Sequence, residues 1–558
     1  MMNGAQMVVE ALRREGVEVL FGIPGGTVIP LFDAMVNAPF RQVLTRHEQG
    51  AVHAAEGYGR ASGKVGVCLV TSGPGATNTL TGLADAHLDS VPLVVITGQV
   101  KTSLIGTDAF QEADIFGCSM PVVKHSFLVR TLEQLPAALA GAFHIARTGR
   151  PGPVLVDIPV DVQNARGEFD YPPALNFPGY SAEVAEELSG LDEARRLLER
   201  SERPMILAGG GIILSDAAEA LLGLAEAGSI PVATTFMGKG GFPERHPLSL
   251  GTAGMHGRAQ ANRALCEADV VLAVGTRLSD RTTGRPDGFA PKAKLIHVDM
   301  DRAEVGKTFS PQVGLVGDAA KVLSLLAPSV EGKDCRAWRE TLDGWTRSYP
   351  LEPAPDVLSA PLVIRAVRRL VDEETVVVTE VGQHQMWAGL HWETNRPRSF
   401  ISSGGLGTMG FGLPAALGAA FATGKPVVCF AGDGSLLMNI QELESCSRYN
   451  LPVKVIVLNN GSLGMVRQWQ ELFFDERYAQ TLEGVHCDFV ALAESFFMRG
   501  YRVKVAEELE ETLKEALETP GPALVDCVIP WRDKVFPMVP AGAALGDFLW
   551  PDGGPTES

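Results

Sequence analysis

The chain has 558 residues, of which 46% are hydrophobic and 20% are charged, and its formal net charge is −18. This composition is typical of a globular protein with a sizeable core, and the length corresponds to three or four domains. The negative charge disfavours nucleic acid as a partner, although helix dipoles and a metal ion can still hold a small phosphorylated ligand.

The sequence shows no feature of an exported or membrane protein. The eight cysteines include no Cys-x-x-Cys pair, and several lie in apolar runs, which favours reduced core thiols. The N-terminus carries Glu10, Arg13 and Arg14 and lacks an apolar signal core. No apolar run reaches the length of a membrane span. We therefore predict a cytoplasmic protein without a membrane partner.

Short apolar runs alternate with helix-like segments along the whole chain. The runs are 65–70, 93–97, 154–158, 205–208, 270–274, 295–298, 376–379, 427–431, 454–458 and 523–529. Buried parallel strands joined by helical crossovers have this pattern. Breaker-rich stretches at 161–190 and 346–360 indicate linkers. We predict an α/β fold of three domains with mostly parallel sheets flanked by helices: N-terminal 1–165, central 186–330 and C-terminal 360–535, followed by a tail, 536–558.

The first and third predicted domains resemble each other. In one, 63–68 leads into Gly73-Pro74-Gly75, then a helix, Pro92 and the apolar run to Thr97. In the other, 424–429 leads into Gly432-Asp433-Gly434, then a helix, Pro452 and the run to Leu458. The shared order and near-equal spacing favour a duplicated α/β unit, with a ligand that bridges the two copies.

A metal and diphosphate site is predicted in the third domain. Gly432-Asp433-Gly434 ends an apolar strand and opens a helical stretch, where the backbone can approach a phosphate and an aspartate can ligate Mg²⁺. Asn459-Asn460 ends the next strand, which returns Asn460 to the same sheet edge. Gly-Asp-Gly alone is also typical of a plain turn, but the pair of motifs is the pattern of thiamine diphosphate (ThDP) enzymes.

From near residue 3 to near residue 545, the chain resembles the catalytic large subunit of the acetohydroxyacid synthase (acetolactate synthase) family. The matching segments are Phe21–Gly26, Arg46–Ala51, Thr71–Asn78, Gly106–Glu112, Gly149–Val154, Gly404–Gly410 and Gly464–Gln470. Several are shared by ThDP decarboxylases in general. The Phe110-Gln111-Glu112 loop and the segment 465–469 are narrower and indicate the biosynthetic synthases.

The resemblance implies an activity. Such an enzyme decarboxylates pyruvate on ThDP and condenses the remaining two-carbon unit with pyruvate or 2-oxobutyrate. The products are 2-acetolactate or 2-aceto-2-hydroxybutyrate, in branched-chain amino acid biosynthesis. The implied cofactors are ThDP, Mg²⁺ and FAD, and the FAD performs no net redox step. The implied assembly is a homodimer or homotetramer with active sites at the dimer interface, where Glu48 of one subunit meets Asp433 and Asn460 of another.

For the ThDP site, the resemblance implies that Glu48 contacts N1′ of the aminopyrimidine and so activates the cofactor. By its type alone, Glu48 is more typical of a solvated helix charge, and only the His47-Glu48-Gln49-Gly50 context favours the role in the cofactor site. The implied ThDP contacts are Glu48, Gln383, His384, Gly407, Met409, Gly432, Asp433, Gly434, Ser435, Asn460 and Met465, with Met409 as an apolar wedge. The implied metal ligands are Asp433, Asn460 and the backbone carbonyl of Ser462.

For the central domain, a glycine-rich turn follows the strand 205–208 and can admit a pyrophosphate, although it is also typical of a tight turn. The implied FAD contacts are Arg150, Gly209, Gly210, Gly211, Gly254, Met255, His256, Gly275, Arg277, Asp299, Gly317 and Asp318. Ser279 stands where relatives commonly carry aspartate, which weakens the FAD prediction slightly.

Four residues are predicted to contact the substrate: Phe110, Gln111, Arg281 and Trp469. An arginine fork suits the carboxylate of a 2-oxo acid, and an indole can pack against the extra methyl group of 2-oxobutyrate. Without the resemblance, these types are also typical of a core tryptophan, a surface ion pair and loop packing.

Three alternatives remain beside this interpretation. An FAD-free fermentative acetolactate synthase and a pyruvate oxidase are disfavoured by Trp469 and the Phe110-Gln111 loop. A catalytically inactive regulatory paralogue is disfavoured because Glu48, Asp433 and Asn460 are all present. The sequence does not decide between pyruvate and 2-oxobutyrate as acceptor, between dimer and tetramer, or whether a small regulatory subunit is required.

Overall fold

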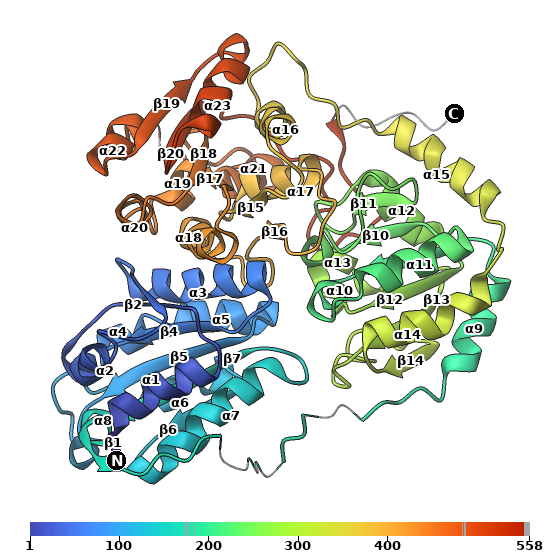
Figure 1. Ribbon diagram of the computed structural model, residues 1–558. Helices are drawn as coiled ribbons and strands as arrows, with labels where there is room; N and C mark the ends of the chain where they lie inside the picture. The colour runs from blue at the N-terminus through green and yellow to red at the C-terminus, as the bar shows by residue number, and fades with distance from the viewer. Residues whose placement is uncertain are drawn as a thin grey trace.

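The computed structural model describes residues 1–551 except 173, 174, 176, 178, 183, 184, 483, 485 and 486. In this part of the chain, three units each contain one six-stranded parallel sheet flanked by helices (Figure 1). The predicted fold class is confirmed. No helix of the described residues is both long and apolar enough to cross a membrane.

The N-terminal unit has the strand order β3-β2-β4-β5-β7-β6. Its strands are β2 (Val19–Gly22), β3 (Arg41–Leu44), β4 (Gly66–Val70), β5 (Leu93–Gln99), β6 (His125–Leu128) and β7 (Pro153–Pro159). Its helices are α1 (Gly4–Arg14), α2 (Ile29–Ala34), α3 (Glu48–Ser62), α4 (Pro74–Thr77), α5 (Leu80–Asp89), α6 (Ile115–Ser119), α7 (Leu135–Arg147) and α8 (Val160–Asn164). Two short strands, β1 (Met2–Asn3) and β8 (Arg166–Gly167), pair antiparallel beside it. Every residue of β4, β5 and β7 is buried, because helices cover both faces of a parallel sheet.

The central unit has the strand order β11-β10-β9-β12-β13-β14. Its strands are β9 (Pro204–Ala208), β10 (Val232–Thr234), β11 (Ser249–Thr252), β12 (Val270–Val274), β13 (Lys294–Asp299) and β14 (Val313–Val316). Its helices are α9 (Leu191–Arg200), α10 (Gly211–Leu214), α11 (Ala218–Gly228), α12 (Ala259–Glu267), α13 (Asp280–Thr283), α14 (Ala319–Leu326) and α15 (Arg336–Ser348). The strand order reverses between β9 and β12, and sheets of this order bind dinucleotides at the carboxyl ends of the strands beside that point.

The C-terminal unit has the strand order β16-β15-β17-β18-β20-β19. Its strands are β15 (Val376–Thr379), β16 (Phe400–Ile401), β17 (Val427–Gly432), β18 (Val453–Asn459), β19 (Arg499–Val503) and β20 (Ala523–Val528). Its helices are α16 (Ala360–Leu370), α17 (Gln383–His391), α18 (Gly412–Thr423), α19 (Asp433–Leu436), α20 (Glu442–Arg448), α21 (Gly464–Phe473), α22 (Phe489–Ser495) and α23 (Leu509–Glu518). Numbered within each unit, the first and last sheets both have the order 2-1-3-4-6-5. This shared topology supports the duplication predicted from the sequence.

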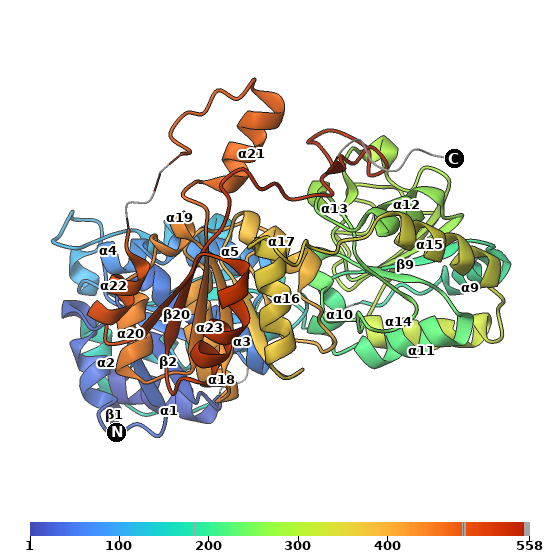
Figure 2. The same cartoon turned by 90° about the horizontal axis from the view of Figure 1, so that it is seen from above.

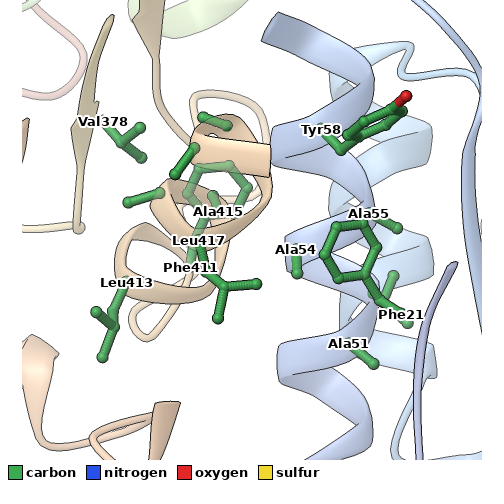
Figure 3. Close-up of a cluster of buried hydrophobic side chains, with 14 of the residues drawn as sticks. Phe21, Ala51, Ala54, Ala55, Tyr58, Val378, Phe411, Leu413, Ala415 and Leu417 are labelled. Carbon is green, nitrogen blue, oxygen red and sulfur yellow. The ribbon is translucent and has the colours of Figure 1, made fainter. Parts of the chain in front are cut away.

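The N-terminal and C-terminal units pack through α3 and α18 (Figure 3). A Cβ atom on Gly57 would lie 2.0 Å from the carbonyl oxygen of Ala415, and one on Gly418 would lie 1.8 Å from that of Ala54. No side chain fits at such distances, so only glycine permits this approach of the two backbones. A single apolar core therefore continues from one sheet across the two helices to the other.

A fully buried polar cluster lies where these two units meet. His53 Nδ1 on α3 is 3.1 Å from Glu56 Oε2, and Asp85 on α5 accepts hydrogen bonds from Ser403 Oγ at 2.5 Å and Thr408 Oγ1 at 3.1 Å. Burial lowers the pKa of His53 to about 4, so its ring is neutral at pH 7. Burial, and then the nearby Asp85 carboxylate, raise the pKa of Glu56 well above its ordinary value. The protonated form of Glu56 is therefore favoured, and it can donate to Asp85.

The Glu56→Gln variant should have a higher apparent melting temperature than the parent at pH 8. The amide oxygen can still accept from His53, and the amide nitrogen can donate to Asp85 without an ionisable group. A carboxyl group whose folded-state pKa is raised stabilises the fold at low pH, and this contribution is lost as pH rises from its ordinary value toward the raised one. The advantage of the variant, measured by thermal shift, should therefore be larger at pH 8 than at pH 5.

The matched control is Glu219→Gln, which removes an exposed carboxylate on α11. It should leave the melting temperature nearly unchanged at both pH values. A difference between Glu56→Gln and the parent that does not depend on pH would contradict the assignment of a raised pKa.

Candidate functional site

The carboxyl edge of the C-terminal sheet brings the predicted metal residues together. β17 and β18 are neighbouring parallel strands, with Gly432 opposite Leu458, so Asp433 and Asn460 leave the sheet at the same edge. The strand order reverses between β15 and β17, which places His384 of α17 there as well. A Cβ on Gly432 would lie 2.6 Å from His384 Nδ1. This edge has the topology at which open α/β sheets bind ligands.

The turn after β18 is held by the side chain of Asn460. Asn460 donates its Nδ2 to Gln383 Oε1 at 3.1 Å, and its Oδ1 accepts from the backbone N–H and the hydroxyl of Ser462, both at 3.1 Å. The Asp433 side chain is largely buried at the start of α19. An aspartate carboxylate, an amide oxygen and a backbone carbonyl form the donor set that Mg²⁺ prefers, so these residues fit the ion.

His384 is the clearest sign of a missing polar ligand at this edge. Burial lowers its pKa to about 3, so the ring is neutral. Its buried Nε2 has no hydrogen-bond partner among the described residues. A buried polar atom of this kind calls for a ligand or an ordered water.

α19 follows β17 directly at this edge. α19 is a single turn of four residues, Asp433–Leu436, so a helix macrodipole contributes little to anion binding here. The Ser435 hydroxyl donates to Glu380 Oε2 at 2.7 Å, so its side chain is already engaged. A diphosphate at this edge would be held less by a helix macrodipole than by a metal ion and by the close approach of the backbone that Gly432 and Gly434 allow.

Glu380 also anchors the predicted cofactor loop that contains Gly407 and Met409. This buried carboxyl accepts from the backbone N–H groups of Gly410 at 2.8 Å and Leu413 at 3.0 Å. Gly407 has φ +73°, a conformation that favours glycine. The loop is thereby tied to the end of β15, beside His384. Met465 lies close by in the sequence, on α21 after the Asn460 turn.

Glu48 is the first residue of α3, and Asn78 Nδ2 donates to its carboxylate at 2.9 Å. The turn before it is held by Glu442 of α20, whose Oε1 accepts from the backbone N–H groups of Arg46 at 2.8 Å and His47 at 3.1 Å. Burial raises the pKa of Glu442 to about 7. Sequence reasoning missed this contact, because no local pattern marks a pair 395 residues apart.

A cavity of about 900 Å³ lies between the N-terminal and central units. Seven of the residues predicted to bind FAD line it: Arg150, Gly210, Gly211, Gly275, Arg277, Asp299 and Asp318. Its floor is the reversal point between β9 and β12, where a Cβ on Gly211 would lie 2.6 Å from the Cα of Gly275. Burial, and then the nearby Arg150 charge, lower the pKa of Arg277. Two neighbouring guanidinium groups in a large cavity suit an anionic dinucleotide.

Five predicted FAD residues do not line the cavity, although Gly209 and Gly317 directly precede Gly210 and Asp318, which do. Gly209, Gly254, Met255, His256 and Gly317 are not among the described residues that line the cavity. Gly254 and Met255 follow β11 and pack against Arg281, whose carbonyl accepts from the Met255 N–H at 2.8 Å. Burial, and then the Arg281 charge, lower the pKa of His256 to about 4. This segment therefore supports Arg281 in the structure.

Arg281 and Trp469 meet, although they come from different units. The guanidinium of Arg281, on α13, lies 6.0 Å from the indole ring centre of Trp469, on α21. α21 stands out from the body of the molecule (Figure 2). Phe110 is 87% exposed on the N-terminal unit, and Gln111 has φ +59° and packs against Gly73. The structure thus joins one predicted substrate pair and leaves the Phe110–Gln111 loop at the surface.

Comparison with known proteins shows that the sequence of this chain matches one family. Models of the thiamine pyrophosphate enzymes match in three parts: the N-terminal TPP binding domain at residues 2–118, the central domain at 191–326 and the C-terminal TPP binding domain at 380–527. The probable acetolactate synthase large subunit of Methanocaldococcus jannaschii is 47% identical over 99% of this chain and 95% of its own length. The acetolactate synthase isozyme 2 large subunit of Escherichia coli is 46% identical over 98% of this chain and 99% of its own. The acetolactate synthase large subunit of Corynebacterium glutamicum is 46% identical over 98% of this chain and 90% of its own.

The Glu442→Ala variant should speed amide hydrogen exchange in the segment that carries Glu48. Without the carboxylate, the part-buried N–H groups of Arg46 and His47 lose their acceptor, which weakens the protection of this turn. Exchange measured by mass spectrometry should rise in peptides that cover 45–49.

Glu444→Ala is the matched control, because Glu444 binds the side chain of Arg46 and not the backbone. It should leave exchange in this segment close to that of the parent. Equal exchange in both variants would contradict the role given to Glu442.

Proposed function

The chain belongs to the thiamine pyrophosphate enzymes, and we propose that within this family it is an acetolactate synthase. It would decarboxylate pyruvate and condense the two-carbon unit with pyruvate or 2-oxobutyrate, giving 2-acetolactate or 2-aceto-2-hydroxybutyrate. The observation that carries the proposal is the near-complete match to acetolactate synthase large subunits together with a sheet edge that joins Asp433, Asn460 and His384.

The residues of this chain take distinct roles in the proposal. Asp433, Asn460 and the carbonyl of Ser462 would hold Mg²⁺ against the diphosphate of the cofactor. When bound, thiamine diphosphate supplies the carbon nucleophile and the electron sink for decarboxylation. Glu48 would exchange a proton with the aminopyrimidine nitrogen, and Asn78 and Glu442 hold Glu48 and its turn in place.

We propose that a second copy of the chain completes the site. Large apolar side chains are exposed on segments that follow the two strands of the metal site, among them Met438 after α19 and Phe473 and Phe474 at the end of the projecting helix α21. Large exposed apolar side chains are typical of a subunit interface. Glu48 and the Phe110–Gln111 loop of one subunit would then face Asp433 and Trp469 of the other. A dimer is the smallest assembly with this property, and a tetramer contains the same pair.

The cavity between the N-terminal and central units supports FAD as the third cofactor. It lies at the dinucleotide position of a sheet with the order 3-2-1-4-5-6, and it holds Arg150 and Arg277. Ser279 also lines it, so the departure from the family pattern lies within the pocket and leaves both arginines in place. The flavin would have a structural role, because the condensation itself needs no net electron transfer.

A product assay with pyruvate, with and without 2-oxobutyrate, tests the proposed function. ThDP, Mg²⁺ and FAD are omitted in turn. Acetolactate formation that depends on all three supports the proposal. Formation by a colourless protein indicates an FAD-free synthase, and pyruvate oxidation that needs phosphate or a quinone indicates an oxidase.

The Glu48→Gln variant should form acetolactate about 10²–10⁴-fold more slowly, the range for loss of a general acid–base group. Its affinity for ThDP, measured by calorimetry, should stay close to that of the parent, because the diphosphate contacts lie in the C-terminal unit. Glu444→Gln, which changes a glutamate on α20, is the control and should keep full activity. Unchanged acetolactate formation in Glu48→Gln would contradict the assignment.

A further inference from the structure

A buried carboxylate lies behind the turn that carries the proposed metal ligands. Asn459 is the last residue of β18, and its Nδ2 donates to Asp526 Oδ1 on the neighbouring strand β20 at 2.9 Å. Arg502 of β19 donates its Nε to Asp526 Oδ2, also at 2.9 Å. Asn459 is 3% exposed and Asp526 is 2% exposed. Three adjacent strands thus contribute one side chain each to a linear chain of hydrogen bonds.

The placement of this carboxylate needs a reason. Burying an aspartate is costly unless both of its oxygens are satisfied, and a well-packed apolar pair is often as stable or more so. Here Arg502 balances the charge from the edge of the sheet and leaves the other oxygen directed at Asn459. A charged acceptor fixes a donor more firmly than a neutral one does. The arrangement therefore holds the Asn459 amide in one orientation.

The orientation of the Asn459 amide also determines a hydrogen bond within the turn after β18. With Nδ2 bound to Asp526, Asn459 Oδ1 faces the other way and accepts from the backbone N–H of Gly461 at 3.3 Å. Gly461 has φ +60°, and its N–H and the Ser462 N–H are held by the side chains of Asn459 and Asn460 respectively. Two successive asparagines thereby shape the turn that presents the Asn460 amide oxygen and the Ser462 carbonyl.

We infer that Asp526 is a positioning residue for the metal site, acting through Asn459 and held in place by Arg502. The inference rests on the proposed function, since Asn460 and Ser462 are metal ligands only within it. Mg²⁺ demands near-ideal octahedral geometry, so a turn that loses its support presents its oxygens less well. Residues that orient metal ligands typically change metal affinity about 10–100-fold when they are replaced.

The test is calorimetric titration of Mg²⁺ into the full-length apoenzyme saturated with ThDP, which measures binding without catalysis. In Asp526→Asn, the amide cannot accept from both Asn459 and Arg502. The Kd for Mg²⁺ should rise about tenfold or more. At saturating Mg²⁺, kcat should stay within about threefold of the parent, because the carboxylate does not touch the reacting atoms.

A double variant tests the bond itself. In Asn459→Asp/Asp526→Asn, the amide donates to the new carboxylate and its oxygen accepts from Arg502, so every hydrogen bond is restored with reversed roles. The Kd for Mg²⁺ of the double variant should return to within about threefold of that of the parent. Asn459→Asp alone places two carboxylates against each other, so it should bind Mg²⁺ more weakly than the parent and the double variant do. Failure of the double variant to recover Mg²⁺ affinity would overturn the inference.

Two further variants separate positioning from general stability. Asp488→Asn removes the other carboxylate bound to Arg502. Asp488 is exposed and, among the described residues, makes no hydrogen bond to Asn459. Its Kd should equal that of the parent. Arg502→Gln, at a partly exposed site, should also raise the Kd for Mg²⁺. It replaces Asp526→Asn in the test if that variant does not fold. A melting temperature that falls while the Kd stays unchanged would show a purely structural role and overturn the inference.

Asp433→Asn and Asn460→Ala distinguish this inference from the proposed site. If both lose Mg²⁺ binding while Asp526→Asn keeps it, the site stands and the role of Asp526 is wrong. If both bind Mg²⁺ as the parent does, the proposed metal site is wrong, and the role of Asp526 falls with it.

Discussion

The structure depends on a backbone contact between α3 and α18, where Gly57 and Gly418 allow two helices to touch. These are equivalent helices of the duplicated units, because α3 joins β3 to β4 and α18 joins β16 to β17. Their packing fixes the start of α3, and therefore Glu48, relative to the C-terminal unit. Two sets of hydrogen bonds follow from this packing. Glu442 binds the turn before Glu48, and Asp85 binds Ser403 and Thr408. A larger residue at either glycine would separate the units and disturb both contacts.

Features that depend on neighbouring residues could be predicted from the sequence. Apolar runs identified ten of the eighteen strands in the three parallel sheets and missed the other eight, β2, β3, β6, β10, β11, β14, β16 and β19. The motif at 432–434 was placed correctly at a strand end, because a strand and the glycine-rich turn that follows it are local features. The pairing of Arg281 with Trp469 followed from family resemblance rather than from spacing, and the structure brings the two side chains together.

Features that depend on tertiary packing could not be predicted. Glu442 holds backbone groups almost 400 residues away, and Asp526 reaches Asn459 across neighbouring strands. The His53–Glu56–Asp85 cluster exists only because two units close over it. Tertiary packing also separates the residues predicted to bind FAD. Glycines at the reversal point of the central sheet line the cavity, whereas residues 254–256 pack toward Arg281. A net charge of −18 gave no sign of the paired arginines in that cavity.

The central claim is that one metal–diphosphate site is completed by Glu48 of a second copy. Mixing the inactive variants Glu48→Gln and Asp433→Asn, followed by subunit exchange, tests it directly. In a mixed dimer one site carries both changes and the other carries neither, so an equimolar mixture should recover about a quarter of the parent's acetolactate formation. A mixture as inactive as either variant alone, once mass spectrometry has shown that mixed dimers form, would place Glu48 and Asp433 of each site in the same chain and contradict the account.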